Sequence, residues 1–179
     1  MTQKLRLDIE VTGEQTTVGG IGGGINKIQE RLSASQVLPD GTTTGKAERM
    51  WGDARTVTAG AVDALELDNL PSIAGPGAVT FSKIKGLVVK NLSATGYLTL
   101  GGGSGGKTAP AADAWSGTDA GVVGSPFSAD ASTIHLGPGD VFAWSSLAGV
   151  SVVTTNGDEL GVEAFTANQD YEILMWGND

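Results

Sequence analysis

Residues 132–176 read STIHLGPGDVFAWSSLAGVSVVTTNGDELGVEAFTANQDYEILMW, and this stretch decides the fold class. Five short apolar segments occur in it, at 132–136, 141–145, 150–155, 160–165 and 171–176. Turn sequences separate them, with Gly-Pro-Gly-Asp at 137–140 and Asn-Gly-Asp at 156–158, where Asn-Gly suits a two-residue hairpin. A spacing of about ten residues between strands is typical of antiparallel sandwiches and barrels.

The earlier part of the chain carries the same strand signals. Leu5, Leu7, Ile9 and Val11 alternate with charged or polar residues, which predicts a half-buried strand. Further strands are expected at 62–67, at 84–92 and, after a turn at 93–96, at 97–100.

The segment Ile25–Leu32 is ambiguous. Ile25, Ile28 and Leu32 share one face at the helical period of 3.6 residues, but the segment is short and follows three glycines. It is either a single helical turn or an irregular strand.

Composition agrees with an all-β chain of one domain. Gly fills 28 of 179 positions, and such an excess favours tight turns over helices. Hydrophobic residues make up 40% of the chain but aromatic residues only 6%, so the core must consist mainly of aliphatic side chains. There is no Cys, hence no disulfide and no thiolate metal site. No apolar run approaches the ~20 residues that span a bilayer, so we expect no membrane association and synthesis in a cytoplasm.

Two Gly-rich stretches divide the chain. Residues 1–24 are expected to form an N-terminal strand and Gly-rich arm, and 25–179 a β-sandwich domain. Within that domain, the stretch 101–125 is a long Gly-rich loop insertion, and loops of such length usually carry function or are mobile.

Charge is distributed unevenly along the chain. The net charge is −9, and residues 108–179 hold ten Asp+Glu and no Lys or Arg. Because nucleic-acid binding needs cations at phosphates, no nucleic-acid partner is expected for this half. The acidic half either faces water or meets a basic partner surface.

Two catalytic motifs match only formally. Gly101–Thr108 fits the phosphate-loop pattern and Gly102–Gly106 fits the nucleophile-elbow pattern, but both motifs require a following helix. Pro110 and several glycines make that helix improbable, and a triad would have to recruit His135, the only histidine. We therefore expect no catalytic residues and no nucleotide cofactor.

No metal site is evident either. One histidine and no cysteine leave zinc without ligands, whereas calcium stays open because oxygen ligands are plentiful. The acidic residues between 53 and 68 form no calcium-loop pattern and are interpreted as surface charge. They are Asp53, Asp63, Glu66 and Asp68.

Trp115 stands out because it lies in the polar loop insertion. It either contacts a partner, protein or sugar, or folds back over its own sheet. Trp144 and Trp176 fall in expected strands and are interpreted as core or interface residues.

Three stretches together resemble a family of small structural proteins in the virions of tailed bacteriophages. They are 40–67 (DGTTTGKAERMWGDARTVTAGAVDALEL), 79–100 (VTFSKIKGLVVKNLSATGYLTL) and 134–177, with its two turns and the ending YEILMWG. The resemblance covers roughly 100 residues in the expected order, and the chain departs from it at 19–24 and 101–125.

The resemblance implies an antiparallel β-sandwich with a jelly-roll-like topology and no enzymatic activity. It implies a capsid decoration or cement protein that binds the assembled shell of major capsid protein, associates with itself as a homotrimer and resides in the virion. Leu5, Leu7, Ile9 and Trp115 are the candidate partner contacts. The alternatives are a tail or receptor-binding module that contacts a host surface glycan or protein, and a glycan hydrolase on a β scaffold.

Overall fold

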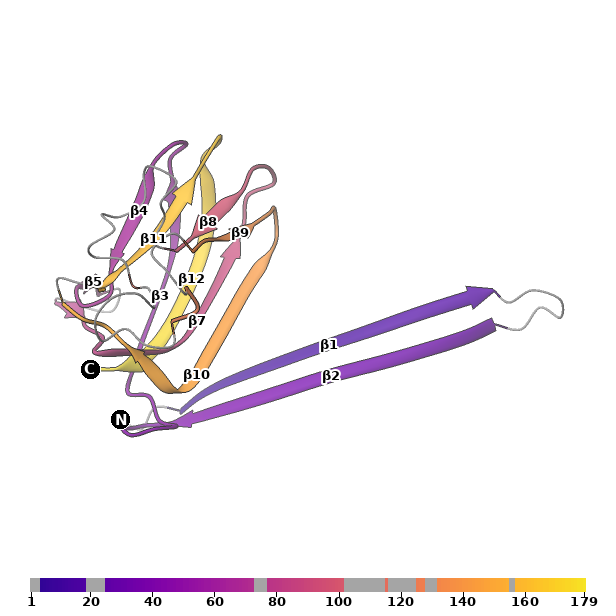
Figure 1. The fold of residues 1–179 in the computed structure, drawn as a ribbon, viewed down its shortest axis with the longest axis horizontal. Coiled ribbons are helices and arrows are strands. Elements are labelled where there is room, and N and C mark those ends of the chain that lie inside the picture. The colour runs from indigo at the N-terminus through magenta and orange to yellow at the C-terminus, as the bar shows by residue number, and fades with distance from the viewer. Residues whose placement is uncertain are drawn as a thin grey trace.

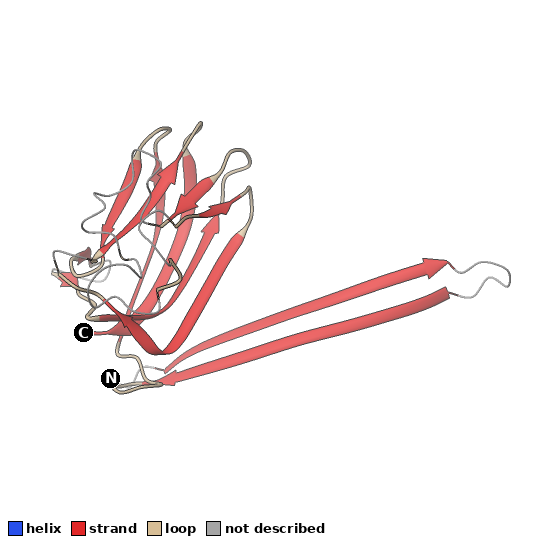
Figure 2. Cartoon of the chain, viewed as in Figure 1, coloured by secondary structure: helices blue, strands red, loops and turns tan. Residues whose placement is uncertain are grey.

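All described elements of the computed structural model are β-strands, which confirms the all-β expectation (Figures 1 and 2). The described residues are 4–18, 25–72, 77–101, 115, 125–127, 132–154 and 157–179. The strands are β1 (Lys4–Val18), β2 (Ile25–Pro39), β3 (Arg49–Val57), β4 (Val62–Glu66), β5 (Leu70–Pro71), β6 (Ala78–Val79), β7 (Lys83–Asn91), β8 (Leu98–Leu100), β9 (Ile134–Leu136), β10 (Val141–Ser151), β11 (Glu159–Ala164) and β12 (Gln169–Asn178).

Two four-stranded antiparallel sheets form the body of the molecule. The first sheet has the order β10-β7-β12-β3 and the second the order β4-β11-β8-β9 (Figure 1). Side chains alternate between the core and the outer face along each strand. In β12, Tyr171, Ile173 and Met175 are buried between the sheets, whereas Asp170 and Glu172 are exposed.

The pairing of the eight sandwich strands defines a jelly roll. Counted in chain order from β3, the first strand pairs with the eighth, the second with the seventh, the third with the sixth and the fourth with the fifth. This is the pattern of a long antiparallel ribbon wrapped into two packed sheets. The topology that the family resemblance implied is therefore confirmed.

Glycine conformation explains one difference from the expected strands. The sequence predicts separate strands at 141–145 and 150–155, but β10 runs continuously to Ser151. Its pairing with β7 shifts between Ser145 and Val150, and Gly149 at φ +78° lets the backbone bulge there without interruption. The predicted turn at 137–140 is confirmed by the hydrogen bond from Asp140 N–H to the Gly137 carbonyl.

β1 and β2 form a separate antiparallel ribbon that extends away from the sandwich (Figure 1). The pairing runs without a shift from Lys4 opposite Pro39 to Val18 opposite Ile25. Ile25–Leu32 is thus strand, and the helical alternative is wrong, because each of its residues lies opposite a β1 residue. The ribbon, which we call the arm (residues 4–39), includes β2, whereas the sequence placed the boundary after residue 24. The Gly-rich stretch 19–24, most of the insertion 101–125, and Asn156 lie outside the described residues.

Candidate functional site

The arm is amphipathic. Residues directly opposite one another in an antiparallel pair share a face, so the register sorts the arm into two faces. Leu5, Leu7, Ile9 and Val11 lie on the same face, where Leu5 is opposite Leu38. That face also carries Ala34 and Leu32, which lie opposite Ile9 and Val11. We call Leu5, Leu7, Ile9, Val11, Leu32, Ala34 and Leu38 the apolar stripe, which the polar Gln36, opposite Leu7, interrupts on β2. The three predicted contact residues of β1 therefore lie together on this stripe.

The opposite face of the arm is mostly polar near the root, with Val37, opposite Arg6, as an exposed apolar exception. Arg6 and Asp8 are exposed and form an ion pair with 2.6 Å between Arg6 Nε and Asp8 Oδ2. Ser35, opposite Asp8, is also exposed. An exposed pair of this kind contributes little to stability. Its side chains instead mark which face of the arm is turned to water.

An apolar cluster fixes the root of the arm to the first sheet. Leu38 of β2 is 1% exposed and packs with Ala47 and Trp176. Trp176 lies flat over Gly86 of β7, where a Cβ atom would come within 1.9 Å of the indole ring. Only glycine at position 86 leaves room for this ring. The root cluster thus brings together β2, the loop that follows it and β12, and its Trp176 packs over the central strand β7.

Hydrogen bonds hold the loop 40–48, which follows the arm, against the same sheet. Lys85 is 1% exposed, and its Nζ donates to the Thr43 carbonyl at 2.8 Å and to the Lys46 carbonyl. Asn178 Nδ2 donates to the Thr42 carbonyl, and Gly45 N–H donates to the Leu147 carbonyl at 2.9 Å. Burial lowers the pKa of Lys85, and the nearby charge of Lys83 acts in the same direction. The arm therefore rests on a firmly held base.

A groove of about 480 Å³ crosses the outer face of the first sheet. Its lining residues are Gly52, Asp53, Ala54, Val88, Lys90, Val141, Glu172, Ile173 and Leu174. Val88 and Leu174 also pack against the root cluster of the arm. Val141 at the rim is 56% exposed. Val88 and Leu174 thus join the groove to the arm root, whereas the exposed Lys90 and Glu172 give the groove a charged part.

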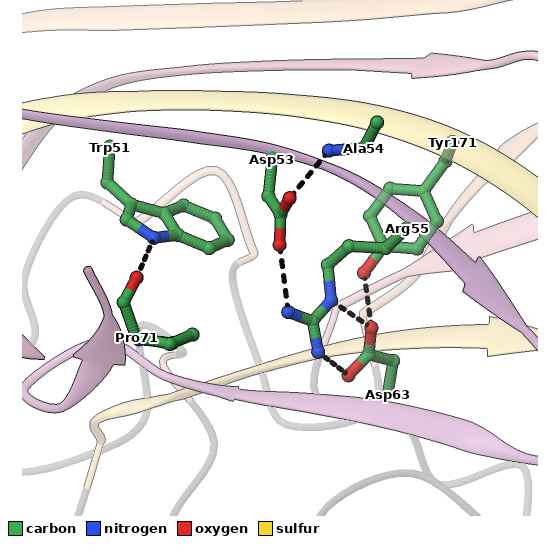
Figure 3. Close-up of polar contacts among 7 residues, drawn as sticks. All are labelled: Trp51, Asp53, Ala54, Arg55, Asp63, Pro71 and Tyr171. Carbon is green, nitrogen blue, oxygen red and sulfur yellow. Dashed lines mark hydrogen bonds and ion pairs between the residues drawn. The ribbon is translucent and has the colours of Figure 1, made fainter. Parts of the chain in front are cut away.

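A polar network connects the two sheets inside the sandwich (Figure 3). Arg55 on β3 donates from Nε and Nη2 to the two carboxylate oxygens of Asp63 on β4, at 2.6 and 2.9 Å. Arg55 Nη1 also donates to Asp53 at 3.1 Å, and the Tyr171 hydroxyl donates to Asp63 at 2.7 Å. A bidentate Arg–carboxylate pair is among the stronger polar contacts in proteins.

The same network shifts the pKa values of its members. The hydrogen bond to Asp63 raises the pKa of Arg55, and burial, followed by the bond to Asp63, raises the pKa of Tyr171. Asp53 and Asp63 are therefore not the free surface charges that the sequence suggested, because Arg55 lies between them. The Asp63 oxygens accept hydrogen bonds from Arg55 and Tyr171, so Asp63 links the two sheets. We call Arg55, Asp63 and Tyr171 the clamp.

The sequence-predicted contact at Trp115 is corrected by the structure. Trp115 is 1% exposed and lies in the core between Trp144 and Phe127, with ring centroids at 5.9 and 6.3 Å. Its Nε1 donates to the Ser151 carbonyl at 3.0 Å. A buried indole needs such an acceptor, which the strand end of β10 supplies. Trp115 thus folds back into its own sandwich and offers no surface to a partner.

His135 and the acidic groups form no reactive constellation in the described parts of the chain. His135 is exposed on β9, with Nδ1 at 3.0 Å from the Thr99 hydroxyl, and Ser104 lies outside those parts. No group of three or more His, Cys, Asp or Glu side chains in them could hold a metal ion. Nor does any helix there have the length and apolar character needed to cross a membrane.

Comparison with known proteins adds no further assignment. The chain matches no family model, no curated protein and no solved structure. The class defined by fold and geometry is a jelly-roll sandwich that carries a two-stranded arm. Sequence reasoning missed the base of the arm, for which no local signal exists. The short alternation of Leu32 and Ala34 with Ser33 and Ser35 is the local signal that could have extended the second strand beyond residue 32.

Proposed function

We propose that the protein is a non-enzymatic bacteriophage virion structural protein. In this proposal it decorates the capsid, binds the assembled shell of major capsid protein, and stabilises it. The observation that carries the proposal is the long amphipathic arm, which projects from a sandwich that fixes its root. The family resemblance at 40–67, 79–100 and 134–177 supports the same role.

The arm is physically suited to binding another protein. Each of its strands has 15 residues, which at ~3.4 Å per residue gives a reach of about 50 Å. An isolated two-stranded ribbon is marginally stable in water unless its apolar face packs against something. A projecting arm with such a face therefore gains stability when a partner covers it.

Because the base of the arm is fixed to the sandwich, a partner that binds the arm also holds the sandwich. Leu38, Lys85 and Asn178 connect the arm and the following loop to β7 and β12. A protein that binds only the assembled shell stabilises that state by mass action. On a shell with many identical sites, modest contacts of each copy act together.

The proposed partners are the major capsid protein and further copies of this chain, in a homotrimer, with the virion as the location. Neither nucleic acid nor a membrane takes part. The tail or receptor-binding alternative relied on Trp115 as a contact, and its burial removes that support. Counting copies per particle separates the two, since a shell protein is present in hundreds of copies and a tail protein in a few.

Deletion of residues 1–36 tests the proposal. This variant lacks both strands of the arm but keeps Leu38 and the base, so the sandwich should fold and show an unchanged β-type circular dichroism spectrum. We expect it to be lost from particles in a quantitative gel. The matched control replaces Arg6 and Asp8 by Ser on the polar face and should bind at full occupancy. Full occupancy of the deletion variant would show that the arm does not bind the shell.

A further inference from the structure

The groove on the first sheet is built from rows of residues that cross all four strands. One row runs from Val141 through Lys90 and Glu172 to Ala54. The next row runs from Ala143 through Val88 and Leu174 to Gly52. With neighbouring strands about 4.8 Å apart, the rows are about 14 Å long between the outer backbones.

The apolar stripe of the arm matches this width. From Leu5 to Val11 the stripe extends over six residue steps, or about 20 Å at ~3.4 Å per step. This covers four strands together with the side chains at the two edges. Beyond it the same face is more polar, with Gly13 opposite Glu30 and Thr17 opposite Asn26, and Ile28, opposite Gln15, is the apolar exception. The apolar part of the arm is therefore as long as the sheet is wide.

The floor of the groove permits close approach. Gly52 and Ala54 of the groove, and Ala143 beside Val88, present hardly any side-chain volume, and Ala54 and Ala143 are exposed. Sheets stack face to face at about 10 Å when their facing side chains are small or interdigitate. A flat two-stranded ribbon fits such a floor better than a helix or an irregular loop does.

The face already binds the arm at one point. Leu38, at the root end of the stripe, is buried with Trp176, and Val88 and Leu174 of the groove pack against this cluster. The rest of the arm then extends away from the sandwich (Figure 1). Its stripe cannot reach the groove of its own chain unless the root cluster opens.

Charge points to the arm as the segment through which copies meet. The arm carries four Lys+Arg and four Asp+Glu, so the net charge of −9 lies entirely on the rest of the chain. Sandwich bodies of like charge repel one another at close range. A neutral arm can approach an acidic body without that cost.

We propose that the apolar half of the arm of one copy lies across the outer face of the sheet β10-β7-β12-β3 of a second copy. The stripe covers the groove, and the polar face with Arg6 and Asp8 stays in water. Each copy then gives one arm and receives another, as in a closed ring. This inference rests on the proposed function, in which copies are neighbours on a shell.

Photo-crosslinking between labelled and unlabelled copies tests the proposal. Because the chain has no Cys, Ala34→Cys carries a benzophenone maleimide at a single site on the stripe. It is mixed with ¹⁵N-labelled wild-type chain at about 1 mM, the effective concentration that a short tether provides. Mass spectrometry then separates crosslinks within a chain from those to the labelled copy.

The expected crosslinks join Ala34→Cys to labelled peptides from β3, β7, β10 and β12. The matched control, Ser35→Cys, places the same probe one residue on, on the polar face, and should give few. Ala143→Arg in the labelled copy buries an unpaired charge under the arm and should lower the crosslink yield at least about tenfold. Ala64→Arg, exposed on the second sheet, should leave the yield unchanged.

Three results would overturn the proposal: crosslinks confined to the probe's own chain, equal yields from both faces of the arm, or attachment elsewhere on the labelled copy. The proposed function is judged separately by particle occupancy. Loss of occupancy on deletion of 1–36, without crosslinks to the sheet, leaves the shell role standing and rejects the arm exchange. Crosslinks to the sheet with full occupancy of the deletion variant support the arm exchange and show that the arm is not what binds the shell.

Discussion

Replacement of Trp115 by Ala tests whether this residue belongs to the core. The indole is 1% exposed, packs edge-on against Trp144 and Phe127, and donates to the Ser151 carbonyl. Trp-to-Ala substitutions in cores cost about 3–5 kcal/mol, because they remove buried area and leave a cavity. At ~2–4 °C per kcal/mol for a chain of this length, Tm should fall by about 10 °C.

Urea unfolding followed by far-ultraviolet circular dichroism measures the change, with the slope of the transition as a check on two-state behaviour. Trp115→Phe keeps an aromatic ring but leaves the Ser151 carbonyl without its donor, so it should cost about 1–2 kcal/mol. Tyr97→Ala is the control, because Tyr97 is 61% exposed and its loss should cost no more than about 0.5 kcal/mol. A Trp115→Ala variant that unfolds like the wild type but no longer binds particles would refute the core assignment.

Three further predictions concern the clamp and the root cluster. Arg55→Met should lower the free energy of unfolding by about 2 kcal/mol, since it leaves the Asp63 carboxylate without a cation and with only the Tyr171 hydroxyl as partner. Adding Asp63→Leu should recover part of the loss, and additive costs in urea unfolding would contradict the pairing. Gly86→Ala places a Cβ atom 1.9 Å from the Trp176 ring, so the ring must move and the root cluster is disrupted. Limited proteolysis should then cut the chain at the arm root, and an unchanged digestion pattern would argue against this packing. The pKa of Tyr171 is raised in the folded chain. The stability that the protonated Tyr171 contributes is complete below about pH 10. It is lost as the pH rises further, because the unfolded chain then gives up the Tyr171 proton while the folded chain keeps it. Tyr171→Phe should therefore lose less stability than the wild type between about pH 9 and about pH 11, and equal losses would speak against the raised pKa.

The strands were predictable because their signals are local. Alternation of apolar and polar residues at 5–11 indicates β1, and the short apolar run at 171–176 indicates β12. Gly-Pro-Gly at 137–139 specifies a turn without help from the rest of the chain. The spacing of these signals then predicts a sandwich or barrel. The jelly-roll topology was predicted from the family resemblance, because the spacing of strands alone does not determine which strands pair.

The features that the sequence left open or missed depend on contacts between distant residues. Ile25, Ile28 and Leu32 fit a helical period as well as part of a strand, and only the β1 partner opposite them decides the matter. The burial of Trp115 is likewise settled by Ser151 and the rings beside it, not by its polar neighbours in sequence. The clamp is another such case, because Asp63 faces an arginine of the opposite sheet. No local pattern reports that two sheets face each other at this place.

The order of the strands in the sequence determines when the root cluster can form during synthesis and folding. The arm leaves the ribosome before the sandwich, but the indole of Trp176 and the amide of Asn178, which hold its root, belong to β12, which follows the other described strands in the sequence. Contacts of such long sequence separation form late in folding. A chain that has not completed its sandwich cannot hold the root of its arm in place, so the arm becomes positioned only in the fully folded molecule.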